Sequence, residues 1–208
     1  MYTNNLSKLL KIIIPIVIIV VICGSIFIWY NNVYRVDKNS NAQDESFMAV
    51  RYFEARNWDK ALNGDGNYPG FISIIDKYKG TNTANIANYY TGIIYLNKGN
   101  YDSAIKYFSQ YDAKDAVTKI TVLGLLGDSN VELKKYDEAL IYYKKAINEA
   151  KNKEGQLGSV YMLKLGLLYE SLNKNKDALD TYNEIKRLYI NPPIDNIDKY
   201  IGRAEAKL

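Results

Sequence analysis

Residues 127–143 read GDSNVELKKYDEALIYY, and the spacing within this stretch decides the fold. A glycine is followed by a bulky residue nine positions later, an alanine twelve positions later and an aromatic residue sixteen positions later. The pattern occurs three times, with its glycines 35 and 39 residues apart, and a period of this length predicts stacked helical hairpins. The instances are Gly92/Tyr101/Ala104/Phe108, Gly127/Tyr136/Ala139/Tyr143 and, more weakly, Gly166/Asn175/Ala178/Tyr182.

Each position in the pattern has a packing role. The glycine on the first helix of a hairpin lets the neighbouring helix approach closely, and the alanine on the second helix does the same from the other side. The aromatic residue fills the remaining space between the helices. The pattern therefore predicts repeated helix pairs rather than a sheet.

A fourth unit precedes these three. Its alanine, Ala61, lies 43 residues before Ala104, which is about nine more than the usual period of such repeats. The excess falls in residues 63–70, which are rich in turn-forming residues, so we expect a loop that interrupts the second helix before it resumes at residues 71–78. The matching positions are Met48, Ala49, Tyr52, Trp58 and Ala61.

The predicted fold is all-α. An N-terminal transmembrane helix is followed by an α-solenoid of about four helical hairpins and a C-terminal capping helix, because a solenoid needs a cap over its last apolar face. Pro192-Pro193 is expected to end the last hairpin, and residues 151–158 to form a lengthened connection. The predicted boundaries are 1–11 (N-terminus), 12–30 (membrane span), 31–41 (linker), 42–191 (repeats) and 192–208 (cap).

Residues 12–30 contain no charged residue and would span about 28 Å as a helix, close to the thickness of the hydrocarbon core. Trp29 and Tyr30 close this run, as interfacial aromatic residues do. Lys8 and Lys11 precede it without acidic residues, which predicts a cytoplasmic N-terminus. The expected location is the inner membrane, with a single span and a periplasmic C-terminal domain.

Two other interpretations of this segment compete with an uncleaved anchor. Cys23-Gly24-Ser25 resembles a signal-peptide cleavage site, but the apolar run continues past it to Tyr30. A lipoprotein would need a small residue before Cys23, where Ile22 stands. The uncleaved anchor is therefore favoured, and the sequence leaves open whether cleavage ever occurs.

The composition argues against enzyme chemistry and cofactors. The chain has no histidine and one cysteine, which excludes common zinc sites and catalytic triads. Without Lys8, Lys11, Arg35, Lys38 and Asp37, the 27 basic and 23 acidic residues become 23 and 22. This balance argues against nucleic-acid binding. Residues 63–67 alternate oxygen side chains with glycine, but a calcium loop would need glutamate at its twelfth position, where Ile74 stands, so we expect a structural turn and no metal.

The repeated stretches resemble tetratricopeptide repeats, whose signature combines W-x2-L-G-x2-Y with A-x3-F. With the N-terminal apolar segment, ALNGDGNY at 61–68 and ANYYTG at 87–92, the chain looks like membrane-anchored tetratricopeptide proteins of Bacteroidetes-type bacteria. Those in turn resemble the periplasm-facing ancillary subunit of the Sec translocon. The resemblance implies a non-enzymatic scaffold that binds secreted proteins, envelope proteins or chaperones near the translocon, with no small-molecule substrate.

First-helix positions 2, 5, 9, 12 and 13 of such repeats line an inner groove, which is predicted to be apolar with several carboxylates. It would suit an amphipathic helix or an extended apolar segment with some positive charge. The same side chains could instead pack against a neighbouring helix, since a register error of one residue would place them there. The candidate groove residues are Val50, Phe53, Tyr89, Ile93, Leu96, Asp128, Val131, Glu132, Leu163, Leu167 and Glu170.

Two functions remain open at this point. The first is the anchored binding scaffold. The second is a structural organiser of envelope assembly or cell division, in which the same groove mediates oligomerisation. The sequence decides neither the partner nor the oligomeric state.

Overall fold

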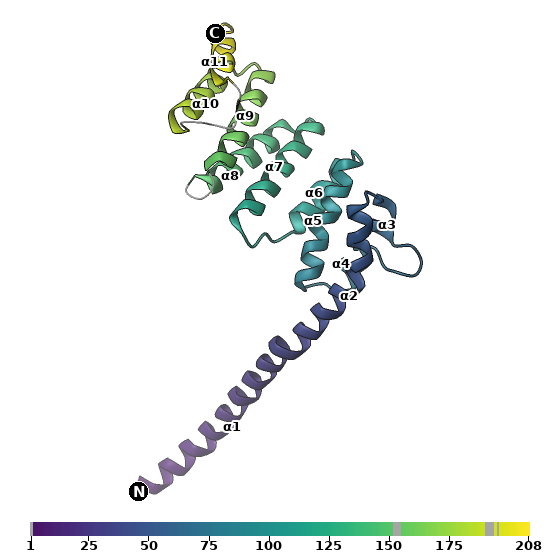
Figure 1. The fold of residues 1–208 in the computed structure, drawn as a ribbon. Coiled ribbons are helices and arrows are strands. Elements are labelled where there is room, and N and C mark those ends of the chain that lie inside the picture. The colour runs from purple at the N-terminus through teal and green to yellow at the C-terminus, as the bar shows by residue number, and fades with distance from the viewer. Residues whose placement is uncertain (1, 152–154, 190–193, 195) are drawn as a thin grey trace. The chain divides into compact units, whose positions relative to one another are not determined.

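The structure, a computed structural model, describes residues 2–151, 155–189, 194 and 196–208, with side chains from Ile13 onward except at 31 and 32. Apart from one isolated bridge between Gly64 and Pro69, these residues form helices, turns and irregular connections (Figure 1). The elements are α1 (Tyr2–Trp29), η1 (Tyr30–Tyr34), α2 (Arg35–Glu54), α3 (Trp58–Asn63), α4 (Phe71–Lys77), α5 (Asn82–Asn97), α6 (Tyr101–Gln110), α7 (Ala116–Glu132), α8 (Tyr136–Ala150), α9 (Gly155–Ser171), α10 (Asn175–Leu188) and α11 (Ile197–Glu205).

The chain forms two compact units, residues 1–84 and residues 85–208. The first unit contains the hairpin of α2 with α3 and α4. The second contains the hairpins α5/α6, α7/α8 and α9/α10, followed by α11. The all-helical hairpin architecture predicted from the repeats is confirmed.

The contact predicted between glycine and aromatic residue is present in all three hairpins of the second unit. A Cβ atom added to each glycine would lie far inside van der Waals distance of the aromatic ring on the following helix, so no larger residue fits without a shift. The aromatic rings are almost completely buried. The distances from the added Cβ to the nearest ring atom are 2.6 Å for Gly92 and Phe108, 2.5 Å for Gly127 and Tyr143, and 2.3 Å for Gly166 and Tyr182.

Four hairpins share one turn geometry. The turn residue has a left-handed backbone conformation, and the next residue donates its N–H to a carbonyl five positions earlier, which is the Schellman motif that ends many helices. The shared turn shows that α2 and α3 form a hairpin of the same kind as the other three. The left-handed residues are Arg56 (φ 55°), Gly99 (71°), Lys134 (58°) and Asn173 (58°).

The loop expected inside the first hairpin is confirmed, because α3 ends at Asn63 and α4 begins at Phe71. Asp65 closes the loop. Its Oδ1 accepts the backbone N–H groups of Asn67 and Tyr68, at 3.0 and 2.8 Å, and its Oδ2 accepts the hydroxyl of Tyr52 at 2.6 Å. The carboxylate thus serves as a structural acceptor for its own loop.

The N-terminal helices run on without a break. Trp29, Tyr34 and Arg35 have right-handed helical dihedrals where α1, η1 and α2 meet. Residues 31–41, expected as a linker, are therefore helical and belong to η1 and α2. Searched over the residues that the structure describes, no helix combines the length and the apolar character that a membrane crossing requires.

The later connections differ in part from the expectation. α9 begins at Gly155, so residues 155–158 are helical and do not belong to a lengthened connection. Pro192-Pro193, expected to end the last hairpin, lies outside the described residues. α11 packs Ile197, Tyr200, Ile201 and Ala204 against the core of the second unit.

Candidate functional site

The orientation of the first helices follows from their glycines. Each glycine faces its partner helix, and a residue one position later points about 100° further round the helix. The residue six positions before the glycine points in nearly the same direction as the residue one position after it, because seven residues make almost two full turns of a helix. We name the set at these two positions of α5, α7 and α9 the first-helix face: Ile86, Ile93, Thr121, Asp128, Val160 and Leu167.

The first-helix face carries apolar side chains that are open to solvent. Ile86 and Leu167 are each 39% exposed, although both lie on helices that are otherwise well packed. Ile93 and Val160 are half-buried. Val117, on the same side of α7 by helical periodicity, is 46% exposed.

Several candidate groove residues of the second unit serve packing. Tyr89, Ile93 and Leu96 are partly buried against the cluster formed by Ala104, Phe108, Val122 and Leu126. Val131 and Leu163 are partly buried against the cluster that includes Tyr143 and Tyr182. These five side chains thus combine a packing role with partial exposure.

In the first unit, Val50 and Phe53 are half-buried on α2. The ring of Phe53 lies 5.6 Å from that of Trp58 and 6.4 Å from that of Phe71, measured between centroids. Phe53 therefore holds α3 and α4 against α2.

Asp128 joins two successive hairpins. It accepts the hydroxyl of Tyr143 at 2.8 Å and the ammonium of Lys164, from α9, at 2.8 and 2.6 Å. Burial raises the pKa of the Tyr143 hydroxyl, and the charge and hydrogen bond of Asp128 raise it further. The predicted carboxylate is present on the face, but it is already paired with a cation.

Glu170 is engaged inside the chain. Its side chain is 6% exposed and accepts hydrogen bonds from the hydroxyl of Tyr182 (2.8 Å), from Nε of Arg203 (3.0 Å) and from Nζ of Lys207 (3.3 Å). The last two donors belong to α11 and the residues that follow it. Glu170, expected in the groove, is therefore closed off by the C-terminal helix, and of the three acidic candidates only Glu132 is exposed.

Acidic pH is expected to weaken the hydrogen bonds and ion pairs between Glu170 and the C-terminal residues Arg203 and Lys207. Burial raises the pKa of Glu170, but hydrogen bonds from Arg203, Tyr182 and Lys207 outweigh it, so the pKa is below its ordinary value. A carboxyl whose pKa falls on folding stabilises the protein above the unfolded pKa of about 4.3, and this contribution is lost as the pH falls through the folded pKa. The melting-temperature difference between wild type and Glu170→Gln should therefore shrink below about pH 4.3. A constant difference from pH 7 to pH 3 would contradict this account.

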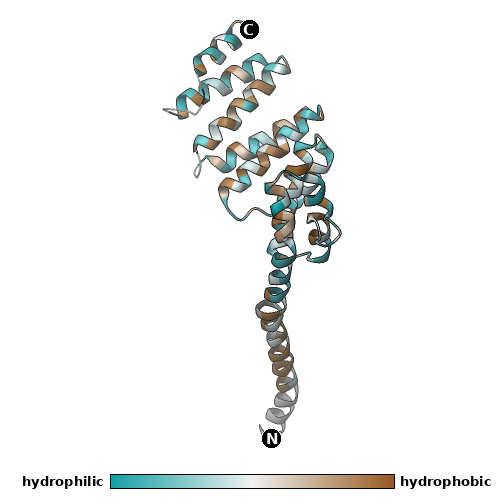
Figure 2. Ribbon diagram, turned by 45° about the vertical axis from the view of Figure 1, so that its right-hand side comes forward, coloured by the Kyte–Doolittle hydropathy of each residue, from teal (hydrophilic) through white to brown (hydrophobic). Residues whose placement is uncertain are grey.

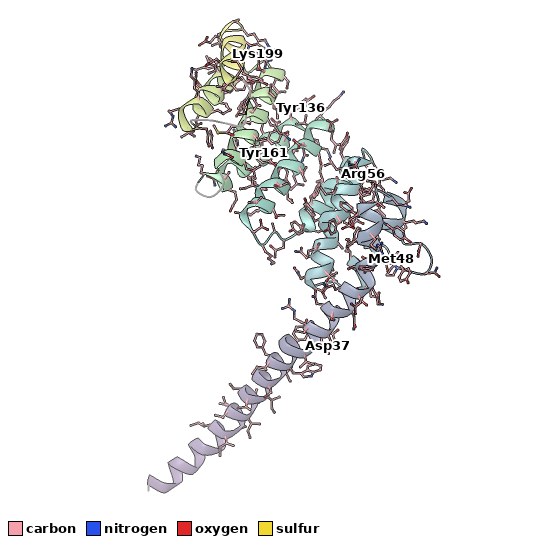
Figure 3. All side chains as sticks on the ribbon, viewed as in Figure 1. Asp37, Met48, Arg56, Tyr136, Tyr161 and Lys199 are labelled. Atoms are coloured by element: carbon pink, nitrogen blue, oxygen red, sulfur yellow. The ribbon has the colours of Figure 1, made fainter. Side chains whose placement is uncertain are left out.

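Three further residues shape the face and were not among the candidates. Tyr161 of α9 (labelled in Figure 3) lies against Gly124 of α7, where an added Cβ would be 1.9 Å from the ring. Lys164 and Arg203 form ion pairs with Asp128 and Glu170, the two acidic groove candidates that are not exposed. Helical spacing places Lys164 beside the face, but the sequence does not show which acid it meets.

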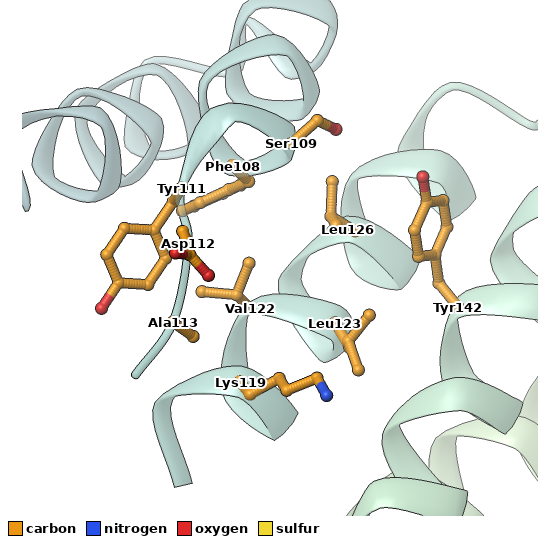
Figure 4. A pocket seen from close by; sticks show the side chains of 10 residues that line it. All are labelled: Phe108, Ser109, Tyr111, Asp112, Ala113, Lys119, Val122, Leu123, Leu126 and Tyr142. Carbon is orange, nitrogen blue, oxygen red and sulfur yellow. The ribbon is translucent and has the colours of Figure 1, made fainter. Parts of the chain in front are cut away.

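Two hollows lie on the opposite side of the first helices. The first, of about 380 Å³, is lined by Val122, Leu123 and Leu126 of α7, which point into it together with Phe108 and Tyr142 (Figure 4). The second, of about 360 Å³, is lined by residues one repeat further on, including Met162 and Leu165. The repeat thus produces equivalent hollows on the side away from the first-helix face.

The geometry defines a protein built from repeated helical hairpins, and comparison with known families specifies the repeat. Residues 82–117, 120–153 and 161–189 each match a family described as tetratricopeptide repeat. These segments coincide with the three hairpins of the second unit. The second unit therefore contains three tetratricopeptide repeats.

Two relatives match the chain, and one of them is itself described as a TPR protein. A TPR repeat-containing protein of Methanocaldococcus jannaschii is 28% identical over 150 residues, 71% of this chain and 24% of that protein. The uncharacterized protein ycf37 of Guillardia theta is 28% identical over 118 residues, 55% of this chain and 64% of that protein. The chain thus matches about a quarter of the first relative and less than two thirds of the second.

Among solved structures, MamA AMB-1 has the same fold. It superposes with a TM-score of 0.54 over 81% of this chain and 83% of that chain, at 16% sequence identity. At this identity the likeness concerns the fold alone. Tetratricopeptide repeats typically serve as non-enzymatic scaffolds for protein–protein interaction, because stacked hairpins form extended surfaces.

Proposed function

We propose that the second unit binds a segment of another protein along the first-helix face. The observation that carries this proposal is the exposure of Ile86 and Leu167, at 39% each, on first helices whose opposite sides are packed. Together with Val117 of α7, these side chains give each of the three first helices one exposed apolar residue on this side, which suits an amphipathic helix or an extended apolar segment.

The charge pattern refines the expected partner. Asp128 is neutralised by Lys164, and Glu170 is enclosed by Arg203 and Lys207. A strongly basic segment would find only Glu132 exposed among the predicted acidic residues. The face therefore favours a partner segment that is mainly apolar, with few charges.

Replacing Leu167 with glutamate should weaken partner binding about tenfold, because a central apolar contact of about 1.4 kcal/mol would be lost. The matched control is Ile141→Glu on α8, whose side chain is 52% exposed and points from a second helix. A photo-crosslinking amino acid at each position, followed by mass spectrometry in intact membranes, identifies the partner. Equal loss of binding in both variants would contradict a site on the first-helix face.

The same crosslinks separate the finer proposals. A scaffold near the Sec translocon should link to channel subunits, chaperones or secreted proteins. The alternative, an organiser of envelope assembly, should give mainly links to itself or to cell-wall and division proteins. The resemblance to periplasm-facing anchored proteins supports the first of these.

We also propose that residues 12–30 attach the chain to the inner membrane, with the repeats on the periplasmic side. From Ile13 to Ile28, the large apolar side chains of α1 are 47–69% exposed, and this part of the helix is largely brown in Figure 2. Ser25 donates its hydroxyl to the carbonyl of Val21 at 2.9 Å, so this polar group is satisfied within the helix, as an apolar surrounding demands. A spin label at Ile18, used in the reconstitution experiment below, tests this attachment.

A further inference from the structure

The C-terminal end of the apolar segment carries a group of aromatic residues, and a pair of cationic residues follows it. Trp29, Tyr30 and Tyr34 are 56%, 48% and 45% exposed. The rings of Tyr30 and Tyr34 stack with centroids 5.5 Å apart, and the ring of Trp29 lies 6.1 Å from that of Tyr34. Two cationic residues, Arg35 and Lys38, come next on α2. We name this set of five residues the collar.

The two cationic residues of the collar also bind the turn that follows α4. Arg35 donates to the carbonyl of Gly80 at 3.5 Å, and Lys38 donates to the carbonyl of Lys79 at 3.1 Å. The next residue of α2, Asn39, accepts the backbone N–H of Thr83 at 3.0 Å. These contacts fix the turn between α4 and α5 to the beginning of α2.

The helix does not bend sharply at the collar. η1 is a short π-helical turn, and the helical dihedrals continue through it into α2. Such turns insert a residue and rotate the following side chains around the axis, and they are frequent at functional positions. Here the turn carries two of the three aromatic side chains of the collar.

We infer that the collar lies in the headgroup layer of a lipid bilayer and holds the turn at Lys79-Gly80 against the membrane surface. This inference rests on the proposed attachment of residues 12–30. Tyrosine and tryptophan favour the membrane–water interface, since each has an apolar ring and a polar tip. Arginine and lysine beside them attract lipid phosphates.

Helix geometry agrees with this depth. Counted from Tyr30, Arg35 lies about 7.5 Å and Lys38 about 12 Å further along the axis. The headgroup layer extends about 5–7.5 Å beyond the hydrocarbon core on each side. Arg35 therefore lies at the outer edge of the layer. Lys38 lies about 5 Å beyond it, a gap that a flexible lysine side chain can span, so the turn that it contacts at Lys79 lies close to the layer.

Spin labels in reconstituted full-length protein test the inference. Single cysteines are placed at Ile18, Lys79 and Glu54 in a Cys23→Ser background, and the protein is inserted into phosphatidylcholine vesicles that contain phosphatidylglycerol. Glu54, the last residue of α2, is the matched control, because it is exposed and about 36 Å beyond Tyr30 along the helix. Collisions with oxygen and with a water-soluble nickel chelate report the depth of each label.

We expect the Ile18 label in the hydrocarbon core, the Lys79 label in the headgroup layer with several-fold fewer nickel collisions than Glu54, and the Glu54 label in water. If Ile18 is embedded but Lys79 behaves like Glu54, the collar inference is overturned and the attachment stands. If the Ile18 label itself is in water, the attachment fails and the inference fails with it. The double variant Arg35→Gln/Lys38→Gln should move the Lys79 label towards water and leave the Ile18 label in place.

Discussion

Replacing Gly127 with alanine is expected to lower the free energy of unfolding of the second unit by about 1–3 kcal/mol, the usual cost of an extra carbon in a packed interior. The added Cβ would lie 2.5 Å from the ring of Tyr143. That ring has no room to move, because it is 4% exposed and its hydroxyl is bound to Asp128. Urea unfolding followed by circular dichroism measures the effect.

Gly202→Ala is the matched control. Gly202 also lies inside a helix, α11, but no atom would come within 4 Å of an added Cβ. Alanine is favoured over glycine in helices by about 0.5–1 kcal/mol, so this variant should gain stability. Opposite signs for the two substitutions would establish the close helix approach, whereas a gain in both would contradict it.

Replacing Glu170 with alanine is expected to release α11. The hydroxyl of Tyr182, which is fully buried, would lose its acceptor, and an unsatisfied buried group costs about 1–3 kcal/mol. Arg203 and Lys207, 40% and 49% exposed, would be rehydrated and add little. Hydrogen-exchange protection of α11 should fall about 5- to 150-fold, the factor that corresponds to this range of energies.

Two comparisons make the Glu170 result specific. Glu205→Ala removes an exposed carboxylate from α11 itself and should leave the protection of the helix nearly unchanged. Adding Tyr182→Phe to Glu170→Ala should restore part of the lost stability, since no hydroxyl is then left unsatisfied. If the double variant is less stable than Glu170→Ala, the unsatisfied hydroxyl is not the cause.

The repeated hairpins could be predicted because their signal is local and periodic. The spacing from Gly92 to Phe108 recurs at Gly127 and Gly166, and the structure shows the contact that the spacing implies. The loop at residues 63–70 followed from the excess over the period. The left-handed turns at Arg56, Lys134 and Asn173 were not recognised, because only Gly99 carries the usual residue. The sequence signal for these turns is that the three residues occupy the same position of the repeat as Gly99.

The candidate site was harder to predict, because it depends on contacts between distant residues. Helical periodicity gives Asp128 and Leu167 equivalent positions, each directly after a glycine. It could not show that Lys164 pairs with Asp128, or that α11 folds back over Glu170 from 33 residues further along the chain. Pairing and covering depend on the three-dimensional path of the chain, which a single repeat does not contain.

The unbroken helix from α1 into α2 has a mechanical consequence. A flexible tether of about ten residues would let the first hairpin explore a radius of about 17 Å in every direction. A helix of the same length holds it about 15 Å away along one axis. The first hairpin therefore keeps a fixed orientation relative to α1 instead of sampling a wide volume. A force on the hairpin is transmitted along the continuous helix and does not first have to extend a flexible linker.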